Sequence, residues 1–237
     1  MAVAFVGQAT ADSGGVNVTT LQWTRTTTTG NYLVLLVAIG SSGTTISSIS
    51  DTAGNTWTNV AKSVTAGQSN RIEAWHCPNA ASITSVTVTF GGSLRAAGNL
   101  SEWSGVDTSG TLDGAAVTAA SAGVTSRSPS ITTSVAGDLV LSASNQNIDA
   151  SPCSLTWTSA TSLTAAGAAS GRTFAGAYII EAAAATETIT WSKGSSGGIG
   201  TLSYAVKAAA GGVTTLSSPA SVTADSTVSA SAVAQAD

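Results

Sequence analysis

Short runs in which apolar or β-branched residues alternate with Thr, Ser and other small polar residues recur along most of the chain. This period of two is typical of strands with one buried face, and no segment shows the sustained 3.6-residue period of a helix. Gly-Asn, Gly-Gly and Pro-Asn turns separate the runs. The pattern predicts an all-β fold of antiparallel strands, over residues 4–10, 16–26, 32–39, 46–51, 56–64, 72–77, 85–90, 97–103, 130–133, 139–143, 155–159, 172–180, 187–191 and 202–207.

Charged residues make up only 8 % of the chain, against about 25 % in an average protein. Thr, Ser, Asn and Gly must therefore cover the solvent-facing positions. The net charge of −4 and the scattering of the 8 basic residues exclude nucleic-acid binding, which needs clustered Lys and Arg. No basic amphipathic stretch favours a membrane surface, and the longest apolar run, residues 32–39, is far shorter than the ~20 residues that span a bilayer. That run predicts a strand buried on both faces.

A set of short motifs occurs twice in the same order, at a nearly constant spacing of about 100 residues. The segment Gly-Asn-Tyr-Leu-Val-Leu from Gly30 is matched by Gly-Asp-Leu-Val-Leu from Gly137. We therefore predict one β-unit in two copies, over about residues 30–106 and 137–207. The other matches are Trp57 with Trp157, Arg71 with Arg172, residues 85–90 with 186–191, and Leu100-Ser101 with Leu202-Ser203.

Two arrangements fit this duplication: two tandem sandwiches, or two halves of one larger jelly-roll-like sandwich. We favour a single antiparallel sandwich over residues 1–208, because the segment between the copies is not a Pro-rich or charge-rich linker. Residues 1–29 also supply strands that lack a counterpart in a two-copy scheme, and these could complete the sheets.

Residues 209–237 differ in character, being rich in Ala, Ser, Thr, Val and Gly with almost no aromatic or charged residue. Ordering each backbone residue costs about 1–2 kcal/mol, which so few apolar side chains cannot offset. We expect an extended C-terminal arm that packs on neighbouring subunits of a homo-oligomer by adding strands to their sheets.

The chain lacks the residue sets of common catalytic and metal sites. His76 is the single histidine, no Gly-x-Ser-x-Gly elbow occurs, and one histidine with the distant Cys77 and Cys153 cannot form a zinc site. His76 and Cys77 cannot act as a dyad, because adjacent strand residues face opposite sides. We expect no enzyme and no cofactor, a partly buried His76, and free thiols in preference to a Cys77–Cys153 disulfide.

Acidic residues raise two alternatives. A glycanase needs two carboxylates about 5–10 Å apart, but Glu73, Glu102, Glu181 and Glu187 are not close-set and are interpreted as solvent-facing. Loop oxygens suited to calcium occur at Asp51 with Asn55 and at Asp107 with Asp113. Because Asp and Asn are also ordinary turn residues, the turn interpretation is favoured.

The aromatic residues fall into two groups. Trp57/Trp157, Phe90/Trp191 and Trp103/Tyr204 recur at matching positions, as a shared core requires. Trp23 and Trp75 have no aromatic counterpart, since Trp75 aligns near Gly176. A ring that stacks on a ligand would come from this unmatched pair, so Trp23 and Trp75 are the candidate binding residues.

Several motifs together resemble a known family. They are Asp-Thr-Ala-Gly-Asn-Thr-Trp at 51–57, Trp-His-Cys-Pro-Asn-Ala at 75–80, Val-Thr-Val-Thr-Phe at 86–90, Glu-Trp-Ser-Gly-Val-Asp at 102–107 and Leu-Asp-Gly at 112–114. Over residues 1–208 the chain resembles jelly-roll-like β-sandwich modules of bacterial surface proteins and of minor tail or other virion proteins of actinobacterial phages. The resemblance implies a fold and a location, and it carries no catalytic motif.

The uncharged surface suits an extracellular protein, yet the start of the chain has neither a basic region nor a long apolar region of an export signal. A phage particle reconciles these features, because its proteins are made in the host cytoplasm and act outside the cell. The expected function is that of a virion surface protein at the tail tip or fibre, which contacts other virion proteins through residues 209–237 and has a host surface glycan as a candidate ligand. The alternatives are a capsid decoration protein and a carbohydrate-binding module of a secreted bacterial protein.

Overall fold

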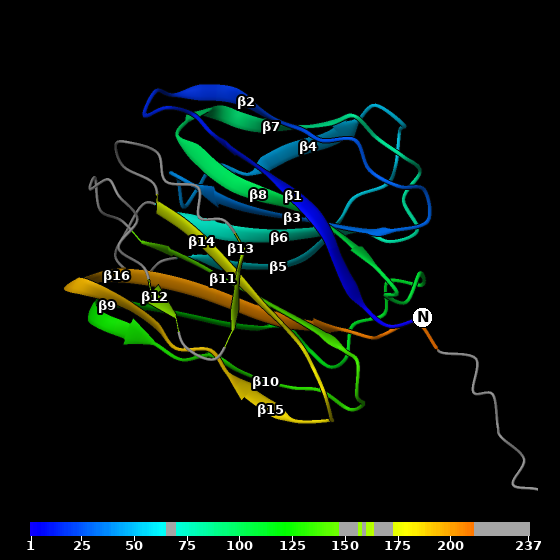
Figure 1. Cartoon of the computed structure of the whole chain (residues 1–237). Coiled ribbons are helices and arrows are strands. Elements are labelled where there is room, and N and C mark those ends of the chain that lie inside the picture. Colours follow the sequence, from blue (N-terminus) through cyan, green and yellow to red (C-terminus); the bar gives the residue numbers. More distant parts are fainter. Residues whose placement is uncertain (65–69, 147–155, 158–159, 164–172, 211–237) are drawn as a thin grey trace, which may run out of the picture.

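The computed structural model describes residues 1–64, 70–146, 156–157, 160–163 and 173–210. Within these ranges every regular element is a β-strand, and the strands form four sheets with antiparallel pairing. The sheets stack as four layers (Figure 1). The prediction of an all-β sandwich is confirmed, and among the described residues no helix could cross a membrane.

The first half of the chain forms two of the layers. Its strands are β1 (Ala4–Asp12), β2 (Val18–Thr24), β3 (Tyr32–Ile39), β4 (Ile46–Asp51), β5 (Thr58–Val64), β6 (Arg71–Cys77), β7 (Ser85–Leu94) and β8 (Ala96–Ser104). A five-stranded sheet has the order β1-β8-β3-β6-β5, and a three-stranded sheet has the order β2-β7-β4. The run predicted to be buried on both faces is β3, at the centre of the larger sheet.

The second half forms the other two layers. Its strands are β9 (Val117–Arg127), β10 (Ser130–Thr132), β11 (Leu139–Gln146), β12 (Thr156–Trp157), β13 (Thr161–Leu163), β14 (Thr173–Ile180), β15 (Thr186–Thr188) and β16 (Trp191–Val206). The larger sheet has the order β12-β16-β11-β14-β13, and β9 also pairs with β16. The smaller sheet contains β10 and β15.

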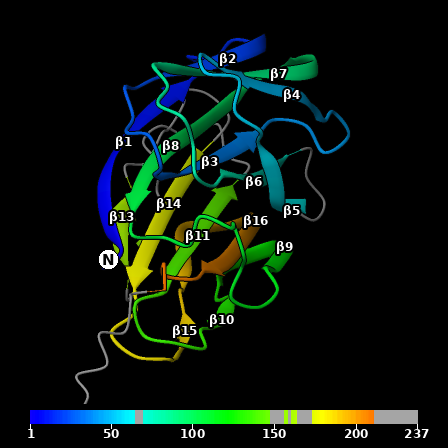
Figure 2. The same ribbon diagram turned by 90° about the vertical axis from the view of Figure 1, so that its right-hand side faces the viewer.

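Three apolar cores separate the four layers, because strand side chains point alternately to the two faces of a sheet. The central core lies between the two large sheets and contains Tyr32, Trp103 and Tyr204. A first outer core lies under the β2-β7-β4 sheet, and a second outer core lies over β10 and β15. Both large sheets are therefore buried on both faces at their centres, as Figure 2 shows from the side.

The two halves have the same strand order. The path β1-β8-β3-β6-β5 is matched by β9-β16-β11-β14-β13, and the β2–β7 pair is matched by β10–β15. The two large sheets pack so that β5 contacts β9, with Ser63 Oγ donating to the Ala119 carbonyl at 3.2 Å. At the opposite edge, the ring of Phe5 on β1 stacks on the ring of Tyr178 on β14 at 5.7 Å. The edge strand of one large sheet therefore lies against the opposite edge of the other large sheet, as a two-fold axis between the halves would produce.

This topology bears on the predicted repeat. The two-copy scheme left residues 1–29 without a counterpart. In the structure their strands, β1 and β2, have counterparts in β9 and β10, which occupy the matching places in the sheets of the second half. Two of the predicted matches are wrong: Phe90 lies on β7 of the small sheet but Trp191 lies on β16 of the large sheet. Leu100 faces an outer core, whereas Leu202 faces the central core. The matches to Arg172 and to the side chain of Trp157 lie outside the described residues.

The choice between one sandwich and two tandem sandwiches is answered by the layers. Each half of the chain forms a two-layer sandwich, and the two sandwiches share the central core. The predicted sandwich of two halves thus has four layers, of which each half of the chain forms two. The short segment at 181–185 is a loop between β14 and β15.

Strand β9 was not predicted from the sequence. Its residues are mostly small, and its burial follows no clean alternation. It is held at the edge of its sheet by backbone pairing to β16, which is interrupted by register shifts near Gly197. An edge strand held by backbone hydrogen bonds carries little hydrophobic periodicity for a sequence analysis to detect.

The fold ends next to the N-terminal strand. Ala208 bridges to Val106, and Ala209 N–H donates to the Gly105 carbonyl at 2.8 Å. Residues 208 and 209 therefore belong to the fold, although residue 209 was predicted to begin the arm. The rest of the predicted arm, residues 211–237, lies outside the described residues.

Candidate functional site

A groove of about 230 Å³ opens on the outer face of the first large sheet, where β5 and β6 meet the start of β4. The groove combines one tryptophan with charged and amide side chains. Its lining residues are Thr45, Ile46, Asn59, Lys62, Arg71, Glu73 and Trp75.

The strand register explains why these side chains meet. Arg71, Glu73 and Trp75 alternate along β6, so they share one face. Across the antiparallel pair, Asn59 lies opposite Trp75 and Lys62 opposite Glu73, and opposite residues point to the same side. A register shift between Asn59 and Ala61 keeps both β5 residues on this face although they are three positions apart.

The Trp75 ring is held by its neighbours. Its Nε1 donates to Glu73 Oε2 at 2.9 Å, and Glu73 Oε1 forms an ion pair with Arg71 Nε at 2.6 Å. Glu73 and Arg71 are buried, while Trp75 is half-buried and packs with one part on the first outer core. An aromatic ring fixed by a buried ion pair, with one part open to a groove, is a preorganised surface for an apolar ligand face.

In the described part of the other half, the positions that match Trp75 and Glu73 hold small apolar residues. Leu35 lies opposite Trp75 and Val37 opposite Glu73. Aligning β3 with β11 from their first residues, Tyr32 and Leu139, places Ala177 and Ala175 at the corresponding positions. These alanines are buried in the second outer core. The Trp75 groove is therefore an addition to the shared sheet topology.

Trp23, the other candidate binding residue, is not available to a ligand. Its side chain is 0 % exposed in the first outer core, and its Nε1 donates to the Gly98 carbonyl at 3.1 Å. The prediction is wrong for Trp23, because β2 packs its apolar face on the large sheet. The matching strand, β10, places Ile131 in the second outer core.

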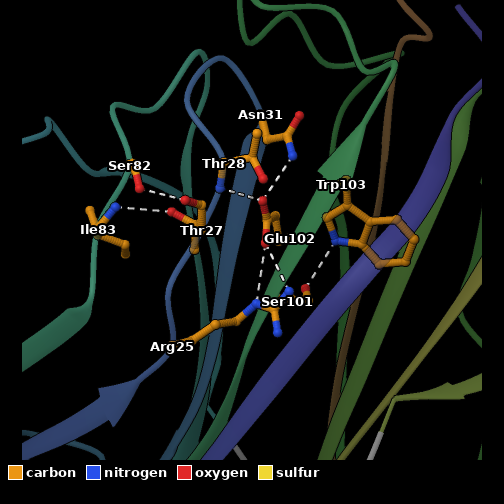
Figure 3. A network of polar contacts seen from close by, with 9 residues as sticks. All are labelled: Arg25, Thr27, Thr28, Asn31, Ser82, Ile83, Ser101, Glu102 and Trp103. Atoms are coloured by element: carbon orange, nitrogen blue, oxygen red, sulfur yellow. Dashed lines mark hydrogen bonds and ion pairs between the residues drawn. The ribbon is translucent and has the colours of Figure 1, made fainter.

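Three of the four glutamates expected to face solvent are in fact buried: Glu73, Glu102 and Glu181. Glu102 accepts from Arg25, from the Thr28 backbone N–H and from the Asn31 amide (Figure 3). Burial alone would raise the pKa of Glu102, but these donors outweigh it and lower the pKa. Burial, with Glu187 and Asp138 nearby, raises the pKa of Glu181.

Glu73 and Glu102 do not form a glycosidase pair. They lie on β6 and β8, on either side of β3, opposite Val37 and Leu33. Four residues along a strand and two strand spacings across it separate the carboxylates by roughly 16 Å. Either glycosidase geometry requires a separation below about 10 Å.

The proposed calcium loops use their oxygens internally. Asp51 Oδ1 accepts from the Ala53 and Asn55 backbone N–H groups, and Oδ2 accepts from Trp57 Nε1 at 2.8 Å. Asp107 and Asp113 likewise accept from nearby serines. The Asp51 and Asp107 contacts are those of turns, whereas Asp113 joins two distant segments by accepting from Ser134. In the described part of the chain no three acidic, histidine or cysteine side chains are grouped to hold a metal.

His76 and Cys77 point to opposite faces of β6, as predicted. His76 Nδ1 shares a hydrogen bond with Tyr32 Oη, and the imidazole is 7 % exposed, so it is more buried than expected. Burial lowers its pKa. Cys77 is free and buried in the first outer core, where burial and then the charge of Asp51 raise the thiol pKa to about 11. Cys153, and with it the disulfide question, lies outside the described residues.

A larger hollow of about 500 Å³ lies on the second half. Its described lining consists of Ala160, Thr161, Tyr178, Ile179 and Ile180. These residues offer two hydroxyls and no charged group, so the hollow provides less polar recognition than the Trp75 groove.

Asn59, Lys62 and Arg71 were not singled out from the sequence. A signal for them exists: Arg-x-Glu-x-Trp places two charges and an aromatic ring on one strand face, in a chain with 8 % charged residues. The partners from β5 follow only from the strand register.

Comparison with known proteins gave no match: no family model, no curated protein and no solved structure matches this chain.

Proposed function

We propose that the protein is a surface-recognition protein of a virion that binds a saccharide through the Trp75 groove. The observation that carries this proposal is the fixed, half-exposed Trp75 ring among polar side chains that can donate and accept hydrogen bonds. A sugar ring has an apolar C–H face, which stacks on an indole, and a rim of hydroxyls, which bind amide and charged groups.

The proposal is for binding without cleavage. The carboxylate in the groove, Glu73, is engaged on both oxygens by Arg71 and Trp75. The spacing of Glu73 from Glu102 does not suit general acid–base work at a glycosidic bond.

A virion location at the tail tip or a fibre is supported by the resemblance of the sequence motifs and by a surface made of Thr, Ser and Asn. Capsid decoration and a secreted carbohydrate-binding module are the alternatives to this location. Electron microscopy of phage particles labelled with an antibody against the protein separates them: label at the tail tip supports the proposal, whereas absence from particles rejects a virion role.

Assembly through residues 211–237 is part of the proposal. The described chain leaves the fold at the same end as the N-terminus (Figure 1), directly after the Ala209–Gly105 hydrogen bond. A long, small-residue segment at this point can reach the sheet edge of a second copy.

The test of saccharide binding is a glycan array probed with the wild-type protein and two variants. Trp75→Ala removes the ring from the groove, and Trp57→Ala removes a half-buried tryptophan that is bonded to Asp51 outside it. We expect binding that is lost in Trp75→Ala and kept in Trp57→Ala, with both variants folded by circular dichroism. Equal binding by all three proteins would reject the groove as the site.

A further inference from the structure

The hydrogen-bond donors in the groove exceed the acceptors. Arg71 is 3 % exposed; its Nε pairs with Glu73, and Nη1 donates to the Ser42 carbonyl at 3.4 Å. Within the described part of the chain, Arg71 Nη2 has no hydrogen-bond partner. A buried guanidinium nitrogen without an acceptor is unfavourable, so a ligand atom that accepts from it would be bound strongly.

Lys62 adds a second cation. It is exposed on β5 opposite Glu73 and lines the groove. In the described residues, ion pairs join Arg25 to Glu102 and Arg71 to Glu73, and neither includes Lys62. Two cations and one carboxylate thus line the groove, in a chain whose net charge is −4.

Glu73 cannot balance both cations, because its two oxygens are already engaged by Arg71 Nε and Trp75 Nε1. An added anion would complete the arrangement. A carboxylate suits it well, since one of its oxygens can accept from Arg71 Nη2 and the other from Lys62, and a charge-assisted hydrogen bond is about twice as strong as a neutral one.

We infer that the ligand of the Trp75 groove is an acidic saccharide of the uronic acid class, whose carboxylate binds between Arg71 Nη2 and Lys62 while its ring stacks on Trp75. This inference rests on the proposed saccharide binding. It adds the charge of the ligand, which the stacking interaction alone does not specify.

The experiment uses pairs of oligosaccharides that differ only in charge. Uronic acid oligomers are printed on an array beside the same oligomers with their carboxyl groups methyl-esterified, and the best-bound pair is then measured by titration calorimetry. We expect the acidic member to bind at least ten times more tightly than its ester. Raising the salt from 50 to 500 mM should weaken only the acidic member, because salt screens exposed charges.

Variants identify the contacts. Lys62→Gln should weaken binding of the acidic member about three- to tenfold and leave the ester unchanged. Lys207→Gln, which removes a lysine outside the groove, should change neither, and Trp75→Ala should abolish both. If the esters bind as tightly as the acids or more tightly, and this binding still depends on Trp75, the inference of an acidic ligand is wrong. The proposed saccharide binding through the groove would then still hold. If no oligosaccharide binds in a Trp75-dependent way, both proposals fail.

Discussion

Trp75 donates its indole N–H to Glu73, two residues earlier on the same strand, across 2.9 Å. Residues at i and i+2 share a sheet face, so this hydrogen bond holds the indole ring along its own strand, β6, and does not tie it to a neighbouring strand. The face is covered by the smaller sheet over most of the layer, and it opens into a groove where β5 and β6 lie near its edge. Local strand geometry therefore orients the Trp75 ring, and the ring is exposed because the three-stranded sheet is narrower than the five-stranded sheet that it covers.

The two unmatched tryptophans should differ in their effect on stability. Trp23→Ala removes a fully buried ring and its hydrogen bond to Gly98, so we expect a loss of about 3–5 kcal/mol in the free energy of unfolding. Trp75→Ala should lose only about 1–2 kcal/mol, because the ring is half-exposed. Urea denaturation followed by circular dichroism measures both, and equal losses would contradict the distinction between core and groove.

Gly98 should not tolerate any side chain. A Cβ there would lie 2.3 Å from the Leu36 carbonyl oxygen and 3.0 Å from the Trp23 ring, and the carbonyl belongs to a paired strand that cannot shift. Gly98→Ala should therefore destabilise the protein by about 3 kcal/mol or more. Gly43→Ala, at a site with open space, is the control and should change stability by less than about 0.5 kcal/mol. A stable Gly98→Ala protein would show that β3 and β8 pack less closely.

The Glu102 network should make stability depend on pH. Its pKa is lowered in the folded state, below the unfolded value of about 4.3. The stabilisation is thus present above pH 4.3 and is lost as the pH falls through the folded pKa. Glu102→Gln should lower stability at pH 7 by about 2–4 kcal/mol, because Arg25 loses its ion-pair partner, and should flatten the decline between about pH 5 and pH 2.

Thermal melting over this pH range measures the effect. Asp12→Asn, which changes an exposed aspartate and keeps the side-chain oxygen that accepts from the Gly14 N–H, should keep the wild-type decline. A Glu102→Gln protein with an unchanged pH profile would show that the buried carboxylate does not govern acid sensitivity.

Cys77 should be unreactive in the folded protein. Its thiol is 2 % exposed, and burial raises its pKa to about 11, so little thiolate forms at pH 8. In a Cys153→Ser background, we expect an aromatic disulfide reagent to modify Cys77 at least about a hundred times more slowly in buffer than in 8 M urea. Similar rates in the two solvents would place the thiol at the surface.

Deleting residues 211–237 should separate folding from assembly. The three apolar cores lie before residue 211, so the melting temperature should change by less than about 2 °C. If the arm binds neighbouring subunits, light scattering should give a lower molar mass for assemblies of the shortened chain than for assemblies of the full chain. Deleting from residue 208 also removes the bridge to Val106 and the Ala208–Asp138 hydrogen bond, and should cost about 1–2 kcal/mol in stability. Unchanged assembly of the shorter chain would reject the role of the arm.

The sequence identified Trp75 as a candidate binding residue, but it did not identify the residues that surround Trp75 in the groove. Trp75 was singled out because the second half has no aromatic residue at its position. The same criterion selected Trp23, which is buried. A missing counterpart shows that a position differs between halves, and it does not show whether the side chain faces a core or a groove, because a neighbouring sheet decides that.

Local alternation was enough to establish the all-β fold, the bounds of β3 and β4, and the opposite orientations of His76 and Cys77, because these depend on backbone geometry within a single strand. The four-layer stack, the edge strand β9 and the burial of Glu102 depended on tertiary structure. Strand pairing joins residues far apart in the chain: Arg25 follows β2 and Asn31 precedes β3, and both meet Glu102 on β8, which pairs with β3. A sequence pattern records which residues prefer burial, whereas the sheet that buries them, and the point at which that sheet ends and leaves Trp75 open, are properties of the assembled layers.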